Sequence, residues 1–265
     1  MIKRGIFGQK GQVTLFVIIA IVIMAAVLLF MIIKPSFIKQ QVSAEEAEKV
    51  LATQGQAVKD LIEKCVSESF VKGVILVGYQ GGYYKPSEYE TLGIYNVSYG
   101  CIKENGIYQN TLPFLTEIGR ELEKYIASSS AAAEIDNCLK NFDSFKKAGI
   151  EVKPENRVIT VGTIELTYIP VSIKWPLTLK AGSASMIISE MDFKVKSGLG
   201  IAHQVAAAIT KGECTEGKFD IPIYLREHPI ATVQVQVSNG KTYYYLITIP
   251  QEGEDPFNFH FIVNN

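Results

Sequence analysis

The sequence predicts an α+β protein that an N-terminal helix holds in a membrane. Three observations predict it: an unbroken apolar segment near the N-terminus, helical spacing of apolar residues after it, and alternating β-branched segments in the second half. We expect a transmembrane helix continuing into an amphipathic helix, then a helical region, then an antiparallel β-sheet domain. The expected divisions are a basic cytoplasmic leader (1–12), a transmembrane helix (13–34), a helical stalk and cysteine-containing α region (35–150), and a mainly antiparallel β region (151–265) with one helix near 199–210.

The apolar segment extends from Val13 to Ile33 and has 21 residues without a charge. At about 1.5 Å per helical residue it spans about 30 Å, which is the thickness of a bilayer's hydrocarbon core. A helix also satisfies its backbone hydrogen bonds internally, as lipid requires. A buried core helix would be shorter, and the apolar part of a cleaved secretory signal has only about 7–15 residues. Membrane lipid is therefore an expected partner.

Basic residues on the N-terminal side predict the orientation of this segment. The first 12 residues contain Lys3, Arg4 and Lys10 and no acid, which favours a cytoplasmic N-terminus. We expect a single-pass protein of the cell membrane with an extracellular main domain. The whole chain has a net charge of −1, so the remainder is mildly acidic and gives no support for nucleic acid as a partner.

The stretch Lys10-Gly11-Gln12-Val13-Thr14-Leu15-Phe16, followed by the apolar segment, resembles the class III signal peptide of archaeal type IV pilin-like proteins. The resemblance implies that a prepilin peptidase cuts between Gly11 and Gln12, removing the leader and keeping the helix. It also implies like subunits as partners through the apolar helix. Many pilins have a glutamate five residues into the mature chain, where this chain has Phe16. An uncut signal anchor is the alternative.

Cys65 followed by the segment Gly78-Tyr79-Gln80-Gly81-Gly82-Tyr83 resembles uncharacterised membrane-anchored surface proteins of small-genome archaea. This resemblance implies no particular activity. From the residues alone, the glycines predict a turn that ends a helix. The segment lacks the Gly-Lys-Ser/Thr of a phosphate loop. A recognition surface lined by its tyrosines is the alternative reading.

Helix signals follow the anchor. Pro35 ends or kinks the apolar helix, and Ser43-Ala44-Glu45-Glu46 has the form of a capping box that restarts one. Apolar residues at three- and four-residue steps then predict an amphipathic helix to about Val77. Residues 87–112 are expected to be irregular. A second helix is expected to open at Leu112-Pro113, and a third, short helix carries apolar residues from 135 to 142.

After Gly149 the composition changes to β-branched and aromatic residues, which predicts antiparallel strands. An alanine-rich segment over 199–210 predicts one helix among them. Asn239-Gly240 favours a tight hairpin turn. The expected strands are 158–161, 164–175, 177–180, 186–196, 230–237, 243–249 and a final strand in which Phe257, Phe259 and Phe261 alternate.

The four cysteines, Cys65, Cys101, Cys138 and Cys214, are widely spaced and form no CxxC pair, which argues against a structural zinc site. An even number in an extracellular domain favours two disulfides. Of the three possible pairings we expect Cys65–Cys138, between two helical pieces, and Cys101–Cys214, between a loop and the sheet. Free buried thiols are the alternative.

No catalytic motif is present. The histidines His203, His228 and His260 have no second ligand at metal spacing, and neither GxSxG nor HExxH occurs. We expect Glu213 and the run 252–255 to be solvated loop charges. The sequence therefore predicts no catalytic, cofactor or metal site.

Asn96-Val97-Ser98 matches the glycosylation acceptor pattern and is expected in a loop. A structural, adhesion or envelope-assembly role without enzyme activity follows from these features together. An anchored extracellular enzyme or ligand-binding module, with a site assembled from distant residues, is the alternative.

Overall fold

The computed structural model describes residues 44–216, 219–238, 240–253 and 255–264. The chain divides into two compact units, residues 1–47 and 48–265; the second is called the head domain below. The expected leader, the apolar segment and the expected cleavage site between Gly11 and Gln12 lie outside the described residues. Among the described residues, no helix has the length and apolar character to cross a membrane.

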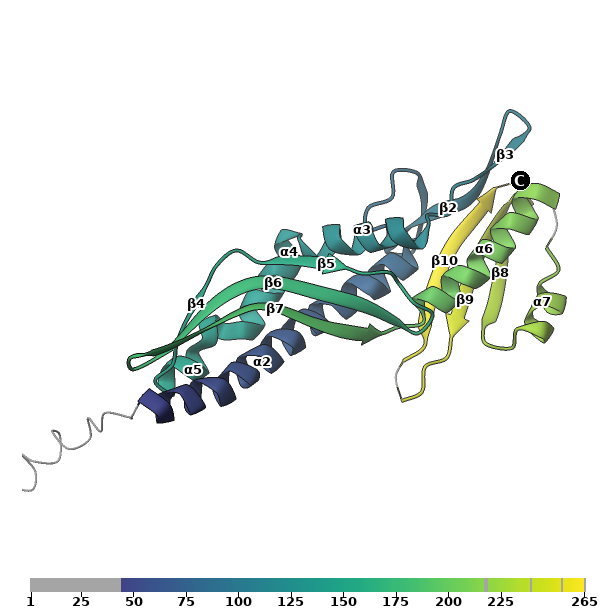
Figure 1. Cartoon of the computed structure of the whole chain (residues 1–265). Helices are drawn as coiled ribbons and strands as arrows, with labels where there is room; N and C mark the ends of the chain where they lie inside the picture. The colour runs from purple at the N-terminus through teal and green to yellow at the C-terminus, as the bar shows by residue number, and fades with distance from the viewer. Residues whose placement is uncertain (1–43, 217–218, 239, 254, 265) are drawn as a thin grey trace, which may run out of the picture. The chain divides into compact units, whose positions relative to one another are not determined.

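The long helix α2 (Ala44–Tyr79) supplies the first side of the head domain's core. Val58, Ile62, Val66 and Phe70 are fully buried, and their four-residue spacing places them on one face of the helix. The amphipathic helix expected to about Val77 is therefore present. Figure 1 shows α2 running along the four-stranded sheet towards the six-stranded one.

The four-stranded sheet is antiparallel and is built around β6 (Tyr168–Ala181). β7 (Ala184–Lys196) pairs with the whole of one edge of β6. The other edge is shared by β5 (Val158–Val161) and β4 (Glu151–Pro154), which pair with successive halves of β6. Burial alternates along β6, so one face of the sheet packs into the core.

Short helices join α2 on this sheet (Figure 1). They are α3 (Leu115–Ile126), α4 (Ser129–Leu139), the 3-10 turn η1 (Lys140–Phe142) and α5 (Asp143–Lys147). The backbone N–H of Val161 in β5 donates to the Glu123 carboxylate of α3 at 2.8 Å, which joins a helix to a sheet edge. One hydrophobic core extends through both sheets and these helices.

The second sheet is mixed and has the order β1-β2-β10-β9-β8, with β3 also paired to β2. β2 and β10 run parallel, and the other pairs are antiparallel. α6 (Leu199–Glu216) packs against β2, β3, β9 and β10, and α7 (Ile221–Glu227) follows it. The strands are β1 (Tyr89–Leu92), β2 (Tyr95–Glu104), β3 (Ile107–Asn110), β8 (Thr232–Ser238), β9 (Thr242–Ile249) and β10 (Phe257–Asn264).

Three sequence-based expectations need correction here. Residues 87–112 are not irregular, since they form β1, β2 and β3. The burial pattern along β2 has pairs of buried residues rather than strict alternation, because β2 lies inside the sheet between β1, β3 and β10. The C-terminal strands do not form one antiparallel domain, since they divide between two sheets. The expected helix at 199–210 continues to Glu216, and α7 follows it.

Candidate functional site

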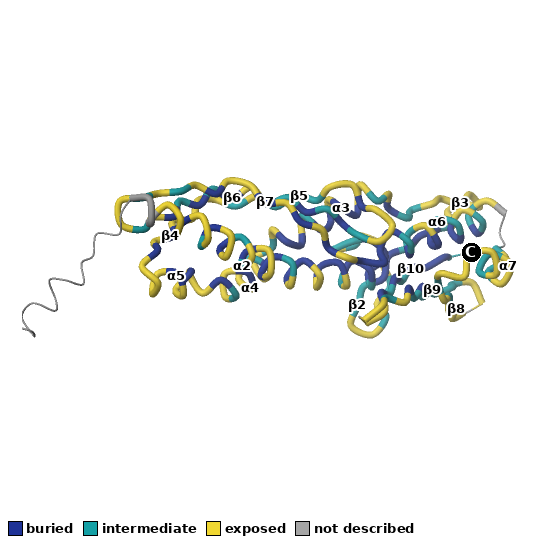
Figure 2. The backbone as a smooth tube through the Cα atoms, turned by 60° about the horizontal axis from the view of Figure 1, so that its bottom comes forward, coloured by how far each residue is buried: buried dark blue, intermediate teal, exposed yellow. Residues whose placement is uncertain are grey.

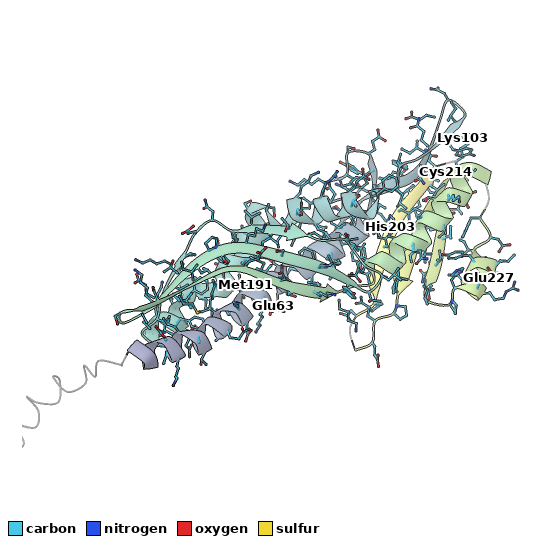
Figure 3. The ribbon with its side chains drawn as sticks, in the orientation of Figure 1. Glu63, Lys103, Met191, His203, Cys214 and Glu227 are labelled. Atoms are coloured by element: carbon cyan, nitrogen blue, oxygen red, sulfur yellow. A yellow bond between two sulfur atoms is a disulfide. The ribbon has the colours of Figure 1, made fainter. Side chains whose placement is uncertain are left out.

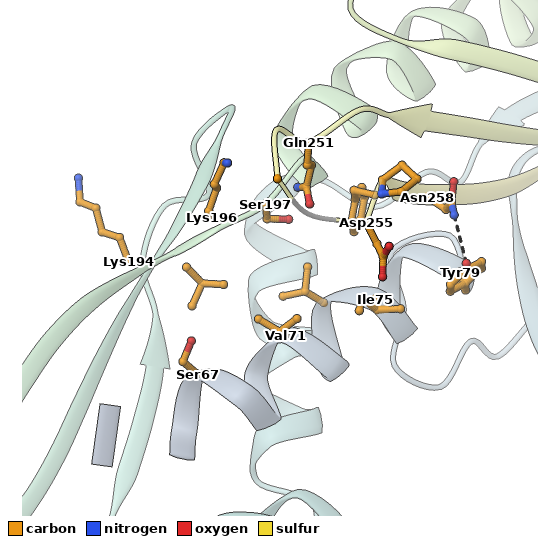
Figure 4. A pocket seen from close by; sticks show the side chains of 15 residues that line it. Ser67, Val71, Ile75, Tyr79, Lys194, Lys196, Ser197, Gln251, Asp255 and Asn258 are labelled. Carbon is orange, nitrogen blue, oxygen red and sulfur yellow. Dashed lines mark hydrogen bonds between the residues drawn. The ribbon is translucent and has the colours of Figure 1, made fainter. Parts of the chain in front are cut away.

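An open groove of about 1000 Å³ lies in the head domain. Three segments line it: the C-terminal half of α2, the end of β7 with the residues after it, and the β9–β10 connection with the start of β10. Figure 4 shows Ser67, Val71 and Ile75 on α2 across from Gln251 and Asp255. Its volume lies at the upper end of the usual range for small-molecule sites, about 300–1000 Å³.

The floor of the groove comes from a second stripe of α2. Ser67, Val71 and Ile75 follow one another at four-residue steps, one position beyond the buried stripe that includes Val66 and Phe70. Val71 is 38% exposed and Ile75 44% exposed, so both present apolar surface to the groove. Apolar side chains in this stripe extend the hydrophobic face of α2 beyond what the core covers.

Hydrogen bonds fix the polar side of the groove. The Gln251 side chain accepts from the Gly198 N–H at 2.7 Å and donates to the Asp255 carbonyl at 3.2 Å, which ties the β9–β10 connection to the end of β7. Lys196 donates to the Glu252 carbonyl at 3.3 Å across the same junction. At the far end, Asn258 donates to the Tyr79 hydroxyl at 3.1 Å, shown as the dashed line in Figure 4.

The groove combines apolar side chains with a few polar ones. None of its described lining residues is a histidine or a cysteine. Figure 4 shows Asp255 directed towards α2 and Lys194 extended away from the groove. The Lys194 ammonium instead lies 4.0 Å from the centre of the Tyr168 ring.

Two disulfides hold segments that are distant in the sequence. Cys65 of α2 is bonded to Cys138 of α4, with Cα atoms 5.6 Å apart. Cys101 of β2 is bonded to Cys214 of α6, with Cα atoms 5.9 Å apart. These are the two pairings expected from the sequence. Figure 3 shows Cys214 near the C-terminal end of α6.

The three histidines lie apart, each in its own surroundings. His203 of α6 has Nε2 2.8 Å from the Pro113 carbonyl, His228 follows α7, and His260 packs edge-on against Tyr79. Burial lowers the pKa of His260, and burial, opposed by the Pro113 hydrogen bond, lowers the pKa of His203. Within the described ranges, no group of three or more His, Cys, Asp or Glu residues is arranged to hold a metal ion.

Glu213 is not the solvated loop charge that the sequence suggested. It lies in α6, is 8% exposed, and accepts a hydrogen bond from the Tyr245 hydroxyl at 3.2 Å. Burial, then the nearby Glu213 carboxylate, raises the pKa of Tyr245. The sequence reading missed this pair because α6 is longer than expected and brings Glu213 against Tyr245 of β9.

The glycine-rich segment after α2 has a structural role. Gly81 has a φ of +73°, and the N–H of Gly82 donates to the Val77 carbonyl at 2.8 Å, which ends the helix in a Schellman motif. The Gln80 amide donates to the carbonyls of Tyr83 and Tyr84. The expected turn is therefore present, with its polar groups used internally.

Asn96 lies in strand β2, not in a loop. It pairs with Thr91 of β1, and its side chain is 3.2 Å from the Thr91 hydroxyl. Ser98 of the same triplet is 3% exposed and donates to the Gly81 carbonyl. The glycosylation pattern thus lies in a paired strand. The expectation of a loop was wrong because the three-residue pattern carries no information on strand pairing.

Comparison with protein-family models, with curated proteins and with solved structures finds no match for this chain. The groove was not foreseen from the sequence. Its residues come from three distant segments, and the one local signal is the additional apolar stripe of Val71 and Ile75 on α2.

Proposed function

We propose that this chain is a non-enzymatic, membrane-anchored surface protein of the type IV pilin-like kind, with a structural, adhesion or envelope-assembly role. One observation carries the proposal: α2, which follows the apolar segment in the sequence, also supplies one side of the head domain's core. Within α2, Val58, Ile62 and Phe70 are fully buried in the head's core. In the sequence, the ten residues 34–43 separate the apolar segment from the start of α2 at Ala44.

The disulfides support the extracellular side of this proposal. Such bonds persist in oxidising environments and are rare in reducing ones. Both link pieces that are distant in the sequence, Cys65 to Cys138 and Cys101 to Cys214. A head displayed outside the cell would benefit from such bracing.

N-terminal sequencing of the protein from its native membrane tests the proposal. The wild-type protein is expected to begin at Gln12. The Gly11→Val variant is expected to keep its leader and to begin at the original N-terminus. Both proteins should remain in the membrane fraction, since the cut leaves the apolar segment in place. An unprocessed N-terminus in the wild type contradicts the pilin-like route, and recovery in the soluble fraction contradicts anchoring.

The groove favours a second candidate, a ligand-binding module that holds an apolar molecule. Native mass spectrometry of the full chain, released from detergent, should then show a co-purified ligand. Ile75→Trp should remove it by filling the groove, whereas Val50→Trp should not. Val50 is a suitable control because it is on the same helix and is equally exposed, at 44%, but does not line the groove. A wild-type spectrum without adduct argues against this candidate.

A further inference from the structure

The strand β8 forms an open edge of the six-stranded sheet. It pairs with β9 on one side, and no described residue hydrogen-bonds to the other edge of residues 232–237. Four consecutive residues, Gln234 to Val237, are exposed, so both faces of the strand are open. Figure 2 shows that β8 is largely exposed, whereas β10 is largely buried. An open edge offers unpaired N–H and C=O groups to another strand.

Edge strands usually carry charges that oppose such pairing, and β7 follows this rule. Its exposed positions include Glu190, Asp192, Lys194 and Lys196. β8, by contrast, has no charged residue, and none occurs between Pro229 and Gly240. Val235 is 41% exposed and Val237 52% exposed. The charged residues on β7 therefore oppose pairing at that edge, whereas the uncharged edge of β8 is suited to pairing.

The sequence of β8 indicates which strand would pair with it. Thr232-Val233-Gln234-Val235-Gln236-Val237-Ser238 reads almost the same in both directions about Val235. In an antiparallel pair of two such strands centred on Val235, every Val lies opposite a Val and every Gln opposite a Gln. We propose that β8 pairs with β8 of a second copy of this chain, in a two-fold symmetric arrangement that continues the sheet across the dimer.

Both faces of the proposed strand pair are chemically matched. Val233, Val235 and Val237 would form an apolar ladder on one face, and their partners in β9 are Ile247, Tyr245 and Tyr243. On the other face the side chains of Gln234 and Gln236 would oppose each other, and each amide can both donate and accept. Directly opposed pairs of this kind stabilise sheets. A two-fold axis requires such self-complementarity, whereas an unrelated partner does not.

This inference does not depend on the proposed function. It requires neither leader cleavage nor contacts through the apolar helix, so the two proposals fail separately. The strand pairing uses only residues of the head domain.

Cysteine cross-linking of the full chain tests the register. Each Val235→Cys residue would face its own copy, with Cα atoms about 4.5–5.5 Å apart, which suits a disulfide. Thr232→Cys alone should not cross-link, because the two copies of residue 232 would lie about 20 Å apart. Co-expressed Thr232→Cys and Ser238→Cys chains should cross-link to each other. All four native cysteines are already paired, so they do not compete.

The control for random collisions is Ile187→Cys, on the charged edge strand β7 and 70% exposed. Oxidised dimer from Val235→Cys should exceed that from Ile187→Cys at least about tenfold, given the disulfide geometry required. Equal yields would overturn the proposal. If Thr232→Cys alone gave as much cross-linked dimer as Val235→Cys, the proposal would also be overturned. In the two-fold register the two copies of residue 232 are too far apart to form a disulfide.

Charge variants provide a second, independent measurement. Val235→Lys and Val235→Glu should each be monomeric when the full chain is purified in detergent, because like charges would meet at the axis. A mixture of the two should recover a dimer, as measured by light scattering after size exclusion. Wild type that is monomeric at all concentrations, or variants that dimerise as well as wild type, would contradict pairing through β8.

Discussion

Gly81 holds the left-handed backbone conformation at which α2 ends, and its surroundings leave no room for a side chain. A Cβ there would collide with the Ser98 hydroxyl and would lie 3.0 Å from the His260 carbonyl. Gly182 also has a positive φ, +60°, but an added Cβ would meet no atom within 4 Å. Comparing alanine substitutions at these two glycines therefore separates the cost of backbone strain from the cost of steric collision.

Gly81→Ala is expected to destabilise the protein by about 2–4 kcal/mol, because strain and collision add. Gly182→Ala is expected to cost only about 1 kcal/mol, from strain alone. Urea-induced unfolding followed by tryptophan fluorescence measures both, since Trp175 is the single tryptophan and is buried. Equal losses would mean that the turn after α2 relaxes around the added methyl group.

His260 links stability to pH. Burial lowers its pKa below the usual 6.5, so protonation favours the unfolded chain. The stability that neutral His260 confers is present above about pH 6.5 and is lost as the pH falls below it. Wild type should therefore lose stability between pH 7 and pH 5, and His260→Phe should lose less. A slope unchanged in His260→Phe would contradict this account.

Among the elements, α2 and α4 are joined covalently as well as by packing. The Cys65–Cys138 bond closes a loop with a sequence separation of 73 residues. Replacing both cysteines by alanine should lower the free energy of unfolding by about 2–4 kcal/mol, because the unfolded chain gains freedom. Non-reducing urea unfolding measures this, with single-variant thiol counts to verify the pairing. A loss below about 1 kcal/mol would indicate that packing alone holds α4.

The elements that could be predicted from sequence are those with a local signal. α2 repeats its apolar residues every four positions, and the β8–β9 hairpin alternates on both sides of Gly240. β2 gave no such signal because it is paired on both sides and its partner β10 lies more than 150 residues away. The groove was invisible for a similar reason: it forms only where three distant segments meet. Pairing between distant segments is set by packing, not by local period.

At the scale of the whole molecule, different surfaces of the head domain have different characters. The buried stripe of α2 organises the core, the neighbouring stripe of Val71 and Ile75 opens into the groove, and β8 leaves an uncharged edge. The proposed ligand binding and the proposed pairing thus use separate residues. Variants in the groove should leave pairing through β8 intact, and variants in β8 should leave the groove intact, because the two surfaces share no residues.

The head domain should fold without residues 1–43, because the described residues of its hydrophobic core begin at Leu51. A chain that begins at Ala44 is expected to form both disulfides and to unfold in one cooperative step, as measured by circular dichroism. A chain that begins at Gln56 serves as the comparison: it lacks Leu51, which is 2% exposed, and should be less stable by about 2–5 kcal/mol. Loss of cooperative unfolding in the longer chain would show that the N-terminal unit is needed to fold the head.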